Sequence, residues 1–320
     1  MLYMEELYQT PHVLKKVMAF KCSRLTGRRL VFCGCGTSFY IGGQVSNICA
    51  RRGIAADAAD AIDVITGDFR LCETDHVVFI SRSGNSMETV LALETAKRAG
   101  AKCFYLGCGE DSALNRACEG SAVIPWANEE NILESCSYYA QLLLACMCCG
   151  IFPSAGLPRL VSQALEKAED YYARHAAGQA LSRMITLGPS FYRPQNREMM
   201  LKDGEITGLP AESWGTLEFR HGPRAWADEH TLIEIIPGKN SREWDEKVAR
   251  ELIRYGCRVR VYSESVFDGA YSYSFGADSY SLEEVLSVAA FHVCVAAHIG
   301  RELGSRPEDL PHIVHNVGDL

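Results

Sequence analysis

Short apolar runs alternate with longer stretches of helical periodicity along most of the chain. The runs at residues 77–80, 102–106, 184–187 and 258–262 have the length of single strands. Strands that are separated by helices of ten or more residues pair in parallel, and the helices then cover both faces of the sheet. The pattern therefore predicts an α/β protein built on mostly parallel sheets.

The same order of motifs occurs twice. Residues 36–40 (Gly-Thr-Ser-Phe-Tyr) and 188–192 (Gly-Pro-Ser-Phe-Tyr) each follow an apolar strand and precede a helical pattern. A second pair, residues 81–86 and 237–241, follows in the same order, again between a strand and a helix. The offset is 152 residues at the serine of the first pair and 155 at the last serine of the second. Two ordered matches at a nearly constant offset indicate a duplicated domain.

The duplication divides the sequence into five segments. We expect an N-terminal helical segment (1–25), a first α/β domain (26–150), a connecting helix (151–180), a second α/β domain (181–304) and a polar tail (305–320) with His312 and His315. A short helix is predicted over residues 11–22, and the connecting helix over residues 157–175.

The charge balance is acidic, with 32 Lys and Arg against 40 Asp and Glu and a formal net charge of −8. A nucleic acid backbone needs a cationic face, so nucleic acid is not an expected partner. The most apolar stretches, 138–152 and 285–299, are shorter than the roughly 18 residues of a spanning helix. We interpret them as buried core helices. Because the start also lacks the apolar core of a secretory signal, we expect a soluble, cytoplasmic protein without membrane contact.

Cysteine is unusually common, with 14 residues, of which 12 precede residue 150. Cys146 and Cys149 have a Cys-x-x-Cys spacing, but no second pair with metal-site spacing follows them. They lie in an apolar run, so we interpret them as buried thiols of a core helix; a metal site is the alternative. Neither a metal nor disulfide bonds are expected.

Two loops rich in glycine and serine are candidates for phosphate binding. Residues 34–38 (Gly-Cys-Gly-Thr-Ser) and 81–86 (Ser-Arg-Ser-Gly-Asn-Ser) each follow a strand and precede a helix. At the carboxyl ends of parallel strands, free amides, hydroxyls and a helix dipole favour an anion. Taken alone, each loop is also typical of an ordinary turn, and Asn85 with Glu88 forms a helix-capping pattern. Phe39 stands where a dinucleotide-binding loop needs glycine, so a dinucleotide is not expected.

The corresponding loops of the second copy are less suited to phosphate. They contain Pro189 and Pro237, and proline has no backbone N–H to donate. We therefore expect that only the first copy retains a phosphate site.

The second copy carries candidates for acid–base chemistry instead. Glu198, Lys202 and Glu205 are spaced i, i+4 and i+7 and share one helix face. This spacing fits a solvated face with an ion pair, or a carboxylate base beside an ammonium. His221 precedes a Gly-Pro pair, and in isolation it fits an ordinary exposed histidine as well as an acid–base group.

The loops at residues 34–38 and 81–86, together with residues 218–223 (Glu-Phe-Arg-His-Gly-Pro), resemble the sugar isomerase (SIS) domain family. Over nearly the whole chain the resemblance is to enzymes with two tandem SIS domains. These include the isomerase half of glucosamine-6-phosphate synthase, tagatose-6-phosphate ketose/aldose isomerase-like proteins and fructosamine-6-phosphate deglycases. The resemblance implies two tandem SIS domains, each a flavodoxin-like three-layer α/β/α sandwich.

The resemblance also implies roles for individual residues. Glu205 matches the general base of the family, Lys202 matches a lysine that assists near it, and His221 matches a ring-opening histidine that relatives receive from the second subunit of a dimer. The positions that match the sugar-phosphate-binding set are Gly36, Thr37, Ser38, Ser81, Arg82, Ser83 and Ser86.

Two departures from the synthase matter. Only 29 residues precede the first expected strand at Leu30, and residue 2 is Leu2, whereas the synthase has a glutaminase domain with a terminal cysteine. The synthase also has a Schiff-base lysine near its C-terminus, but the last lysine here is Lys247. Glutamine-dependent amination is therefore not expected.

These features predict an enzyme that isomerises, deaminates or deglycates a sugar or amino-sugar 6-phosphate by proton transfer between C1 and C2. No cofactor is expected, and the expected partners are the phosphorylated sugar and further copies of the chain in a homodimer or larger homo-oligomer. The alternative is a non-catalytic sugar-phosphate-binding regulator. Such a regulator needs the phosphate loops but not both Glu205 and His221. The sequence does not identify the sugar or the leaving group.

Overall fold

The structure is a computed structural model that describes residues 2–131 and 133–307. The chain divides into two compact units, and the boundary falls between Pro158 and Arg159. The division lies inside the segment predicted to connect the two domains. His312 and His315 lie outside the described residues.

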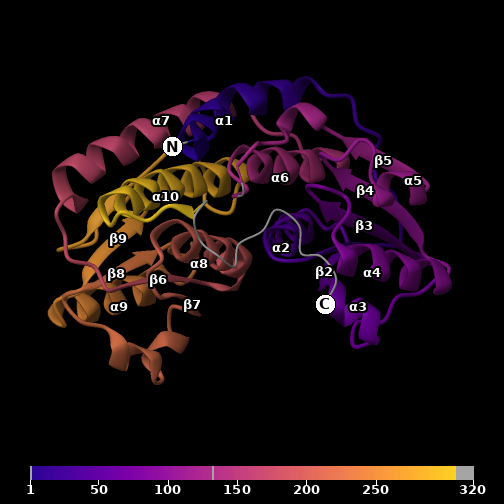
Figure 1. Ribbon diagram of the computed structural model, residues 1–320. Helices are drawn as coiled ribbons and strands as arrows, with labels where there is room; N and C mark the ends of the chain where they lie inside the picture. The colour runs from indigo at the N-terminus through magenta and orange to yellow at the C-terminus, as the bar shows by residue number, and fades with distance from the viewer. Residues whose placement is uncertain (1, 132, 308–320) are drawn as a thin grey trace. The chain divides into compact units, whose positions relative to one another are not determined.

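The first unit contains a parallel sheet of five strands in the order β2-β1-β3-β4-β5 (Figure 1). Its strands are β1 (Arg29–Gly34), β2 (Ala56–Asp60), β3 (Asp75–Ser81), β4 (Lys102–Gly107) and β5 (Gly120–Val123). Its helices are α1 (Leu2–Ala19), α2 (Thr37–Arg51), α3 (Ala61–Thr66), α4 (Met87–Arg98), α5 (Ala113–Ala117) and α6 (Cys136–Cys148), with a 3₁₀ turn, η1 (Pro125–Ala127).

The second unit repeats this order as β7-β6-β8-β9-β10, also parallel throughout. Its strands are β6 (Arg183–Gly188), β7 (Ala211–Gly215), β8 (Thr231–Ile235), β9 (Arg258–Tyr262) and β10 (Tyr271–Tyr273). The helices are α7 (Leu157–Tyr171), α8 (Arg193–Thr207), α9 (Arg242–Arg254) and α10 (Leu282–Glu302), with a π-helical turn η2 (Tyr172–Ala176) and 3₁₀ turns η3 (Ser190–Tyr192), η4 (Glu218–Arg220) and η5 (Pro223–Trp226).

The predicted fold class, α/β with mostly parallel sheets, is therefore confirmed. Both sheets have the strand order of flavodoxin-like folds, in which the order reverses between the first and third strands. In such folds ligands bind in a crevice at this reversal, which falls between β1 and β3 in the first unit and between β6 and β8 in the second.

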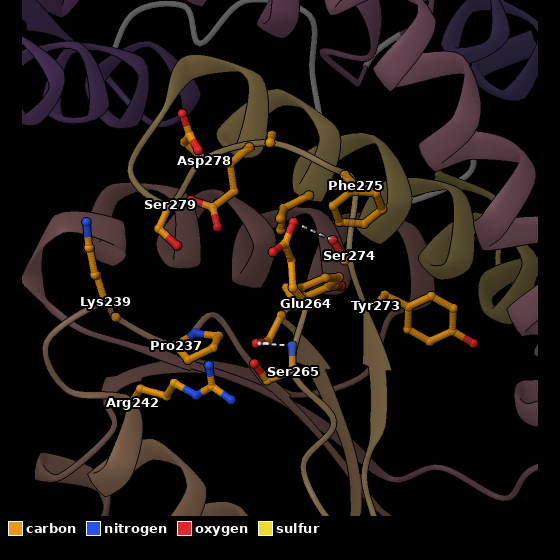
Figure 2. Close-up of a pocket in the computed structure, with 16 residues that line it drawn as sticks. Pro237, Lys239, Arg242, Glu264, Ser265, Tyr273, Ser274, Phe275, Asp278 and Ser279 are labelled. Carbon is orange, nitrogen blue, oxygen red and sulfur yellow. Dashed lines mark hydrogen bonds between the residues drawn. The ribbon is translucent and has the colours of Figure 1, made fainter.

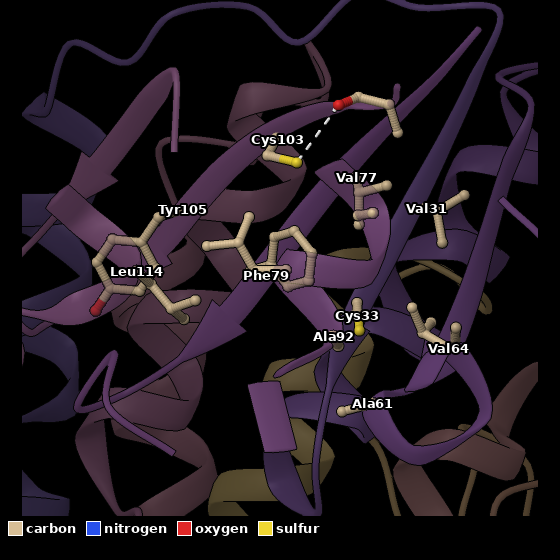
Figure 3. Close-up of a cluster of buried hydrophobic side chains, with 14 residues drawn as sticks. Val31, Cys33, Ala61, Val64, Val77, Phe79, Ala92, Cys103, Tyr105 and Leu114 are labelled. Atoms are coloured by element: carbon tan, nitrogen blue, oxygen red, sulfur yellow. Dashed lines mark hydrogen bonds between the residues drawn. The ribbon is translucent and has the colours of Figure 1, made fainter. Parts of the chain in front are cut away.

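Helices cover both faces of the first sheet. On one face, α3, α4 and α5 pack on strand side chains that include Val77, Phe79 and Tyr105, all with no exposed surface (Figure 3). On the other face, α2 and α6 contact the strands, and α1 packs on α6. A strand that is covered on both faces is apolar at successive positions. The apolar runs in the sequence therefore predicted these strands.

Helix α1 differs from its prediction. It was expected at residues 11–22 but runs from Leu2 to Ala19, with Pro11 inside it. Leu7, Leu14 and Val17 recur at helical spacing and are completely buried. A proline inside a helix costs about 3 kcal/mol, whereas each buried aliphatic side chain contributes about 1.5–3 kcal/mol. Packing on α6 therefore outweighs the lost hydrogen bond.

The two apolar stretches are buried core helices, as predicted, and they form α6 and α10. By length and composition alone α10 could cross a membrane, but 94% of its apolar window is buried inside the protein. Cys146, Cys148 and Cys149 are buried in or next to α6, in agreement with their interpretation as core thiols. Burial similarly raises the pKa of Cys103 and of Cys118 to about 12, so these thiols are poor nucleophiles.

Candidate phosphate-binding and acid–base sites

The first unit brings its two predicted loops to neighbouring strand ends. β1 and β3 pair side by side, so the loop at 34–38 and the serine loop (residues 81–86) leave the same edge of the sheet. They lead into α2 and α4, and neither helix has a side-chain cap on its first amides. Two helix N-termini without side-chain caps at one sheet edge give that edge positive partial charge, which favours an anion.

The serine loop is organised by its own hydroxyls. Ser81 Oγ accepts from the Gly84 amide at 3.0 Å and lies 3.5 Å from Ser86 Oγ, and Ser83 Oγ accepts from the Asn85 amide at 3.2 Å. The capping role predicted for Asn85 is wrong. Its Oδ1 instead accepts from the Ala113 amide at 2.9 Å and ties the loop to α5.

Two glycines that the sequence reasoning missed allow the end of β4 to support this loop. A Cβ atom on Gly107 would lie 2.0 Å from the carbonyl oxygen of Ser81, and one on Gly109 would lie 2.0 Å from that of Ser83. No side chain fits at either position. The signal in the sequence was the Gly-Cys-Gly triplet directly after an apolar strand.

Arg82 is not a free cation. Its Nη1 lies 3.3 Å from Oε1 of Glu129, whose side chain has no exposed surface. The same carboxylate accepts from the amide and hydroxyl of Ser137 at the start of α6. In this structure Arg82 therefore neutralises an internal carboxylate, and its role in binding phosphate stays a prediction.

The serine loop has a counterpart in the second unit, at residues 237–241, and an internal carboxylate occupies its donors. Asp245 Oδ2 accepts from the Gly238 amide at 3.0 Å and from the Ser241 hydroxyl at 2.8 Å. Burial raises the pKa of Asp245, although the bonds it accepts oppose that rise. The position 155 residues earlier is Val90, which has no anion to offer. This difference supports the expected loss of phosphate binding in the second copy.

The acid–base candidates on α8 form a buried group, not a solvated face. Lys202 Nζ lies 2.8 Å from Glu205 Oε2 and 3.7 Å from Glu198 Oε1. The side chains of Lys202 and Glu198 are both 4% exposed, whereas that of Glu205 is 22% exposed. One ammonium thus holds two carboxylates, and only Glu205 is accessible to a ligand.

Next to this group lies a buried charge network that sequence reasoning did not identify, formed by Asp203, Glu234, Arg260 and His292. His292 Nε2 lies 3.2 Å from Asp203 Oδ1 on α8, and its Nδ1 lies 3.0 Å from Glu234 Oε1 on β8. Arg260 on β9 lies 2.5 Å from the same Glu234 oxygen. All four side chains are essentially without exposed surface. Two carboxylates and two cations balance when all four are charged.

The network shifts the pKa values of its members. Burial alone would lower the pKa of His292, but Asp203 and Glu234 outweigh it and raise that pKa to about 10. Burial would also raise the pKa of Glu234, but Arg260 and His292 hold it well below the usual range. The pKa of Asp203 is raised because burial exceeds the effect of His292. The signal in the sequence was a charged residue inside a buried strand, Glu234 in Thr-Leu-Ile-Glu-Ile.

His221 lies apart from these groups. It is exposed at the end of η4, and its backbone amide donates to Glu218 at 2.9 Å. Among residues 2–131 and 133–307, the described hydrogen bonds and ion pairs do not involve its imidazole. The structure therefore brings Lys202 and Glu205 together but does not join His221 to them.

Comparison with known proteins identifies the first unit. Residues 26–148 match the SIS domain. The chain is 28% identical over 225 residues to a glutamine–fructose-6-phosphate aminotransferase of Aquifex aeolicus, covering 67% of this chain and 38% of the relative. It is 25% identical over 256 residues to the D-galactosamine-6-phosphate deaminase AgaS of Escherichia coli O157:H7, covering 73% and 66%. The matches thus span less than two thirds of these relatives.

Solved structures agree in fold. A glucosamine-6-phosphate deaminase of Thermotoga maritima superposes with a TM-score of 0.86 at 21% identity, covering 99% of both chains. A tagatose-6-phosphate ketose/aldose isomerase of Escherichia coli superposes with a TM-score of 0.81 at 19% identity, covering 98% of this chain and 97% of that one. Residues 26–148 are thus similar to a SIS domain, the relatives found by sequence include an aminotransferase and a deaminase named for sugar phosphates, and the solved structures support the fold.

Replacing two loop hydroxyls tests the phosphate site. The double variant Ser81→Ala, Ser83→Ala should bind fructose 6-phosphate at least about tenfold more weakly in calorimetry, because hydrogen bonds to a charged group are worth about 1.5–3 kcal/mol each. The matched control is Ser241→Ala in the second unit, which should bind as the original chain does. Equal affinity in the double variant would remove the site from this loop.

The buried charge network predicts a pH dependence of stability. The pKa of His292 in the folded protein, about 10, exceeds its ordinary value of 6.5. The stabilisation by protonated His292 is therefore complete below about pH 6.5 and is lost as the pH rises through about 10. His292→Gln should be less stable by about 3–5 kcal/mol at pH 6.5, and its free energy of unfolding should change less between pH 6.5 and 10. Denaturant titrations of both proteins, with the exposed His230→Gln as control, measure this. Parallel pH curves would contradict it.

Proposed function

We propose that this protein is an enzyme that isomerises or deaminates a sugar 6-phosphate, or removes its amine-linked group, by moving a proton between C1 and C2. The observation that carries the proposal is the arrangement on α8. The only exposed carboxylate of the group, Glu205, is held by a buried ammonium 2.8 Å away, which is an arrangement suited to a general base. The homologous isomerases and deaminases support the same reaction class.

In this proposal the two units have separate tasks. The uncapped helix N-termini and serine hydroxyls of the first unit bind the phosphate. Glu205 removes a proton from the carbon beside the carbonyl and leaves an enediol or enolamine. Return of the proton to the neighbouring carbon completes an isomerisation. When the carbon that loses the proton carries an amine, return of the proton to the neighbouring carbon turns the enolamine into an imine, and water then releases the amine and leaves a carbonyl group on the carbon that held it. General base catalysis of this kind contributes about 10²–10⁴ in rate.

We further propose that the second unit is a second SIS domain, since its strand order repeats that of the first. His221 would open the sugar ring. Because its imidazole is exposed and joins no described side chain of its own subunit, we propose that it acts in the site of a partner copy in a homodimer.

The first test replaces the base without changing its shape. Glu205→Gln should bind a sugar phosphate normally but lose the exchange of the C1 or C2 hydrogen with deuterated water, because the amide cannot accept the proton. The control is Glu243→Gln on α9, an exposed carboxylate 2.6 Å from Lys247 Nζ, which should leave the exchange unchanged. NMR of the recovered sugar phosphate measures the exchange. Exchange at the original rate in Glu205→Gln would place the base elsewhere, with Glu212 and Glu218 as the next candidates.

Exchange also separates the enzyme from a non-catalytic binding protein. A panel of aldose, ketose, amino-sugar and fructosamine 6-phosphates should include at least one compound that exchanges its hydrogen in the unmodified protein. Tight binding without exchange across the whole panel would assign the chain to the regulatory class instead.

The second test addresses the homodimer. A variant with His221→Gln and a variant with Glu205→Gln should each be inactive on ring-closed substrate. Co-expression should recover part of the activity, because a mixed dimer then contains one site with both original residues. Failure of two soluble variants to complement each other would place both groups in one subunit.

A further inference from the structure

The second unit contains a cavity of about 520 Å³ at the carboxyl ends of β8, β9 and β10, called here the strand-end pocket (Figure 2). This volume lies within the range of small-molecule sites. The pocket is lined by charged and hydroxyl side chains, among them Lys239, Arg242, Glu264, Ser265, Asp278 and Ser279. It does not include Lys202, Glu205 or His221.

The pocket lies beside the crevice of this unit, which the protein fills with its own groups. A Cβ atom on Gly238 would lie 2.8 Å from the Tyr280 hydroxyl and 2.9 Å from Pro189 Cγ. Tyr280 is the one non-glycine residue with positive φ, 68°, in the described part of the chain. Its ring stacks on Tyr192 at 5.3 Å, and its hydroxyl accepts from the Lys239 amide at 2.8 Å. The space for a ligand is therefore on the β9 and β10 side.

Charges of both signs face this space without internal compensation. Across residues 2–131 and 133–307, no described ion pair involves the side chains of Lys239, Arg242 or Asp278. Figure 2 shows Lys239 and Arg242 along one side and Glu264 on the other, with Ser265 and Ser274 near Glu264. Within the described part of the chain, the hydrogen bond given for Glu264 is a long one, 3.5 Å, from the Ser274 hydroxyl. Two cations and two carboxylates, with hydroxyl side chains in the same lining, match a ligand that carries an anion, an amine and hydroxyl groups.

We infer that the strand-end pocket is a second small-molecule site, which binds an amino sugar phosphate as a regulatory ligand. The pocket and its charges predict a ligand that carries both an anion and an amine. That this ligand is a sugar rests on the proposed function. Because the base and its lysine are not part of the lining, occupancy of this pocket would not itself lead to turnover.

A chain of contacts links this pocket to the acid–base helix. Tyr262 lines the pocket, and its hydroxyl donates to Glu234. Glu234 holds His292, and His292 holds Asp203 on α8, the residue next to Lys202. A second link starts at Glu284, which also lines the pocket. Its carboxylate accepts from the hydroxyl of Tyr192, the residue directly before α8 begins. A ligand that shifts Tyr262 would thus act on the C-terminal part of α8, which carries Glu205, and one that shifts Glu284 would act on the start of the same helix.

Calorimetry on the full chain with Ser81→Ala and Ser83→Ala tests the site, because these changes weaken the phosphate site of the first unit. Glucosamine 6-phosphate should still bind this background. Adding Lys239→Gln and Arg242→Gln should weaken the remaining binding at least about tenfold, whereas adding Lys247→Gln, which lies on α9 but outside the pocket, should not. Glucosamine, which lacks the phosphate, and fructose 6-phosphate, which lacks the amine, should each bind more weakly. Absent binding, or binding that ignores Lys239 and Arg242, would overturn the inference.

A second variant keeps the test decisive if the multiple variant does not fold. Glu264→Gln in the otherwise unmodified chain should weaken the binding of glucosamine 6-phosphate at the second site and leave the binding of fructose 6-phosphate unchanged. Equal effects on both ligands would overturn the assignment.

The regulatory role is tested by hydrogen exchange at saturating substrate. Added glucosamine 6-phosphate should change the rate in the original chain but not in Lys239→Gln, Arg242→Gln, and an identical response in both would overturn it. The calorimetric readouts do not need turnover, so they stand if the Glu205 test fails, whereas the exchange readout depends on the proposed function.

Discussion

The second unit depends on four charges that are completely removed from water. Glu234, Asp203, Arg260 and His292 have essentially no exposed surface. An isolated buried charge is very costly, and loss of one partner of a buried pair costs about 3–5 kcal/mol. The four groups are therefore stable only together. They come from α8, β8, β9 and α10, so the requirement that they meet fixes these helices on the sheet.

The two units show how one strand order can serve two purposes. In both, a loop between the third strand and the following helix presents backbone donors. In the first unit the residue four positions after Ser86 is Val90, which has no carboxylate, and the Gly84 and Asn85 amides donate to the hydroxyls of Ser81 and Ser83. In the second unit the same position is Asp245, whose carboxylate accepts from Gly238 and Ser241. The internal carboxylate of Asp245, together with Pro237, is the physical basis for our expectation that this loop does not bind phosphate.

Periodicity predicted the strands and core helices because burial on both sheet faces leaves a local pattern in the sequence. Periodicity did not predict features that depend on contacts between residues far apart in the sequence. Pro11 was expected to begin a helix, but the packing of residues before it extends α1 to Leu2. Asn85 was expected to cap α4, but a backbone amide of another helix competes for its oxygen. The buried charge network left only a hint, since the partner of Glu234 lies 58 residues away at His292.

Exposure increases stepwise from this network to the proposed base. His292 is completely buried, the Lys202 side chain is 4% exposed, and the Glu205 side chain is 22% exposed. Asp203 and Lys202 are adjacent on α8, so His292 holds one side of the helix while Lys202 holds Glu205 on another. Lys202 also contacts the buried carboxylate of Glu198. This second contact keeps the ammonium inside the protein when the Glu205 side chain moves toward solvent. The accessible carboxylate of Glu205 is thus positioned by groups that are themselves almost completely buried, so packing inside the second unit determines where this carboxylate lies.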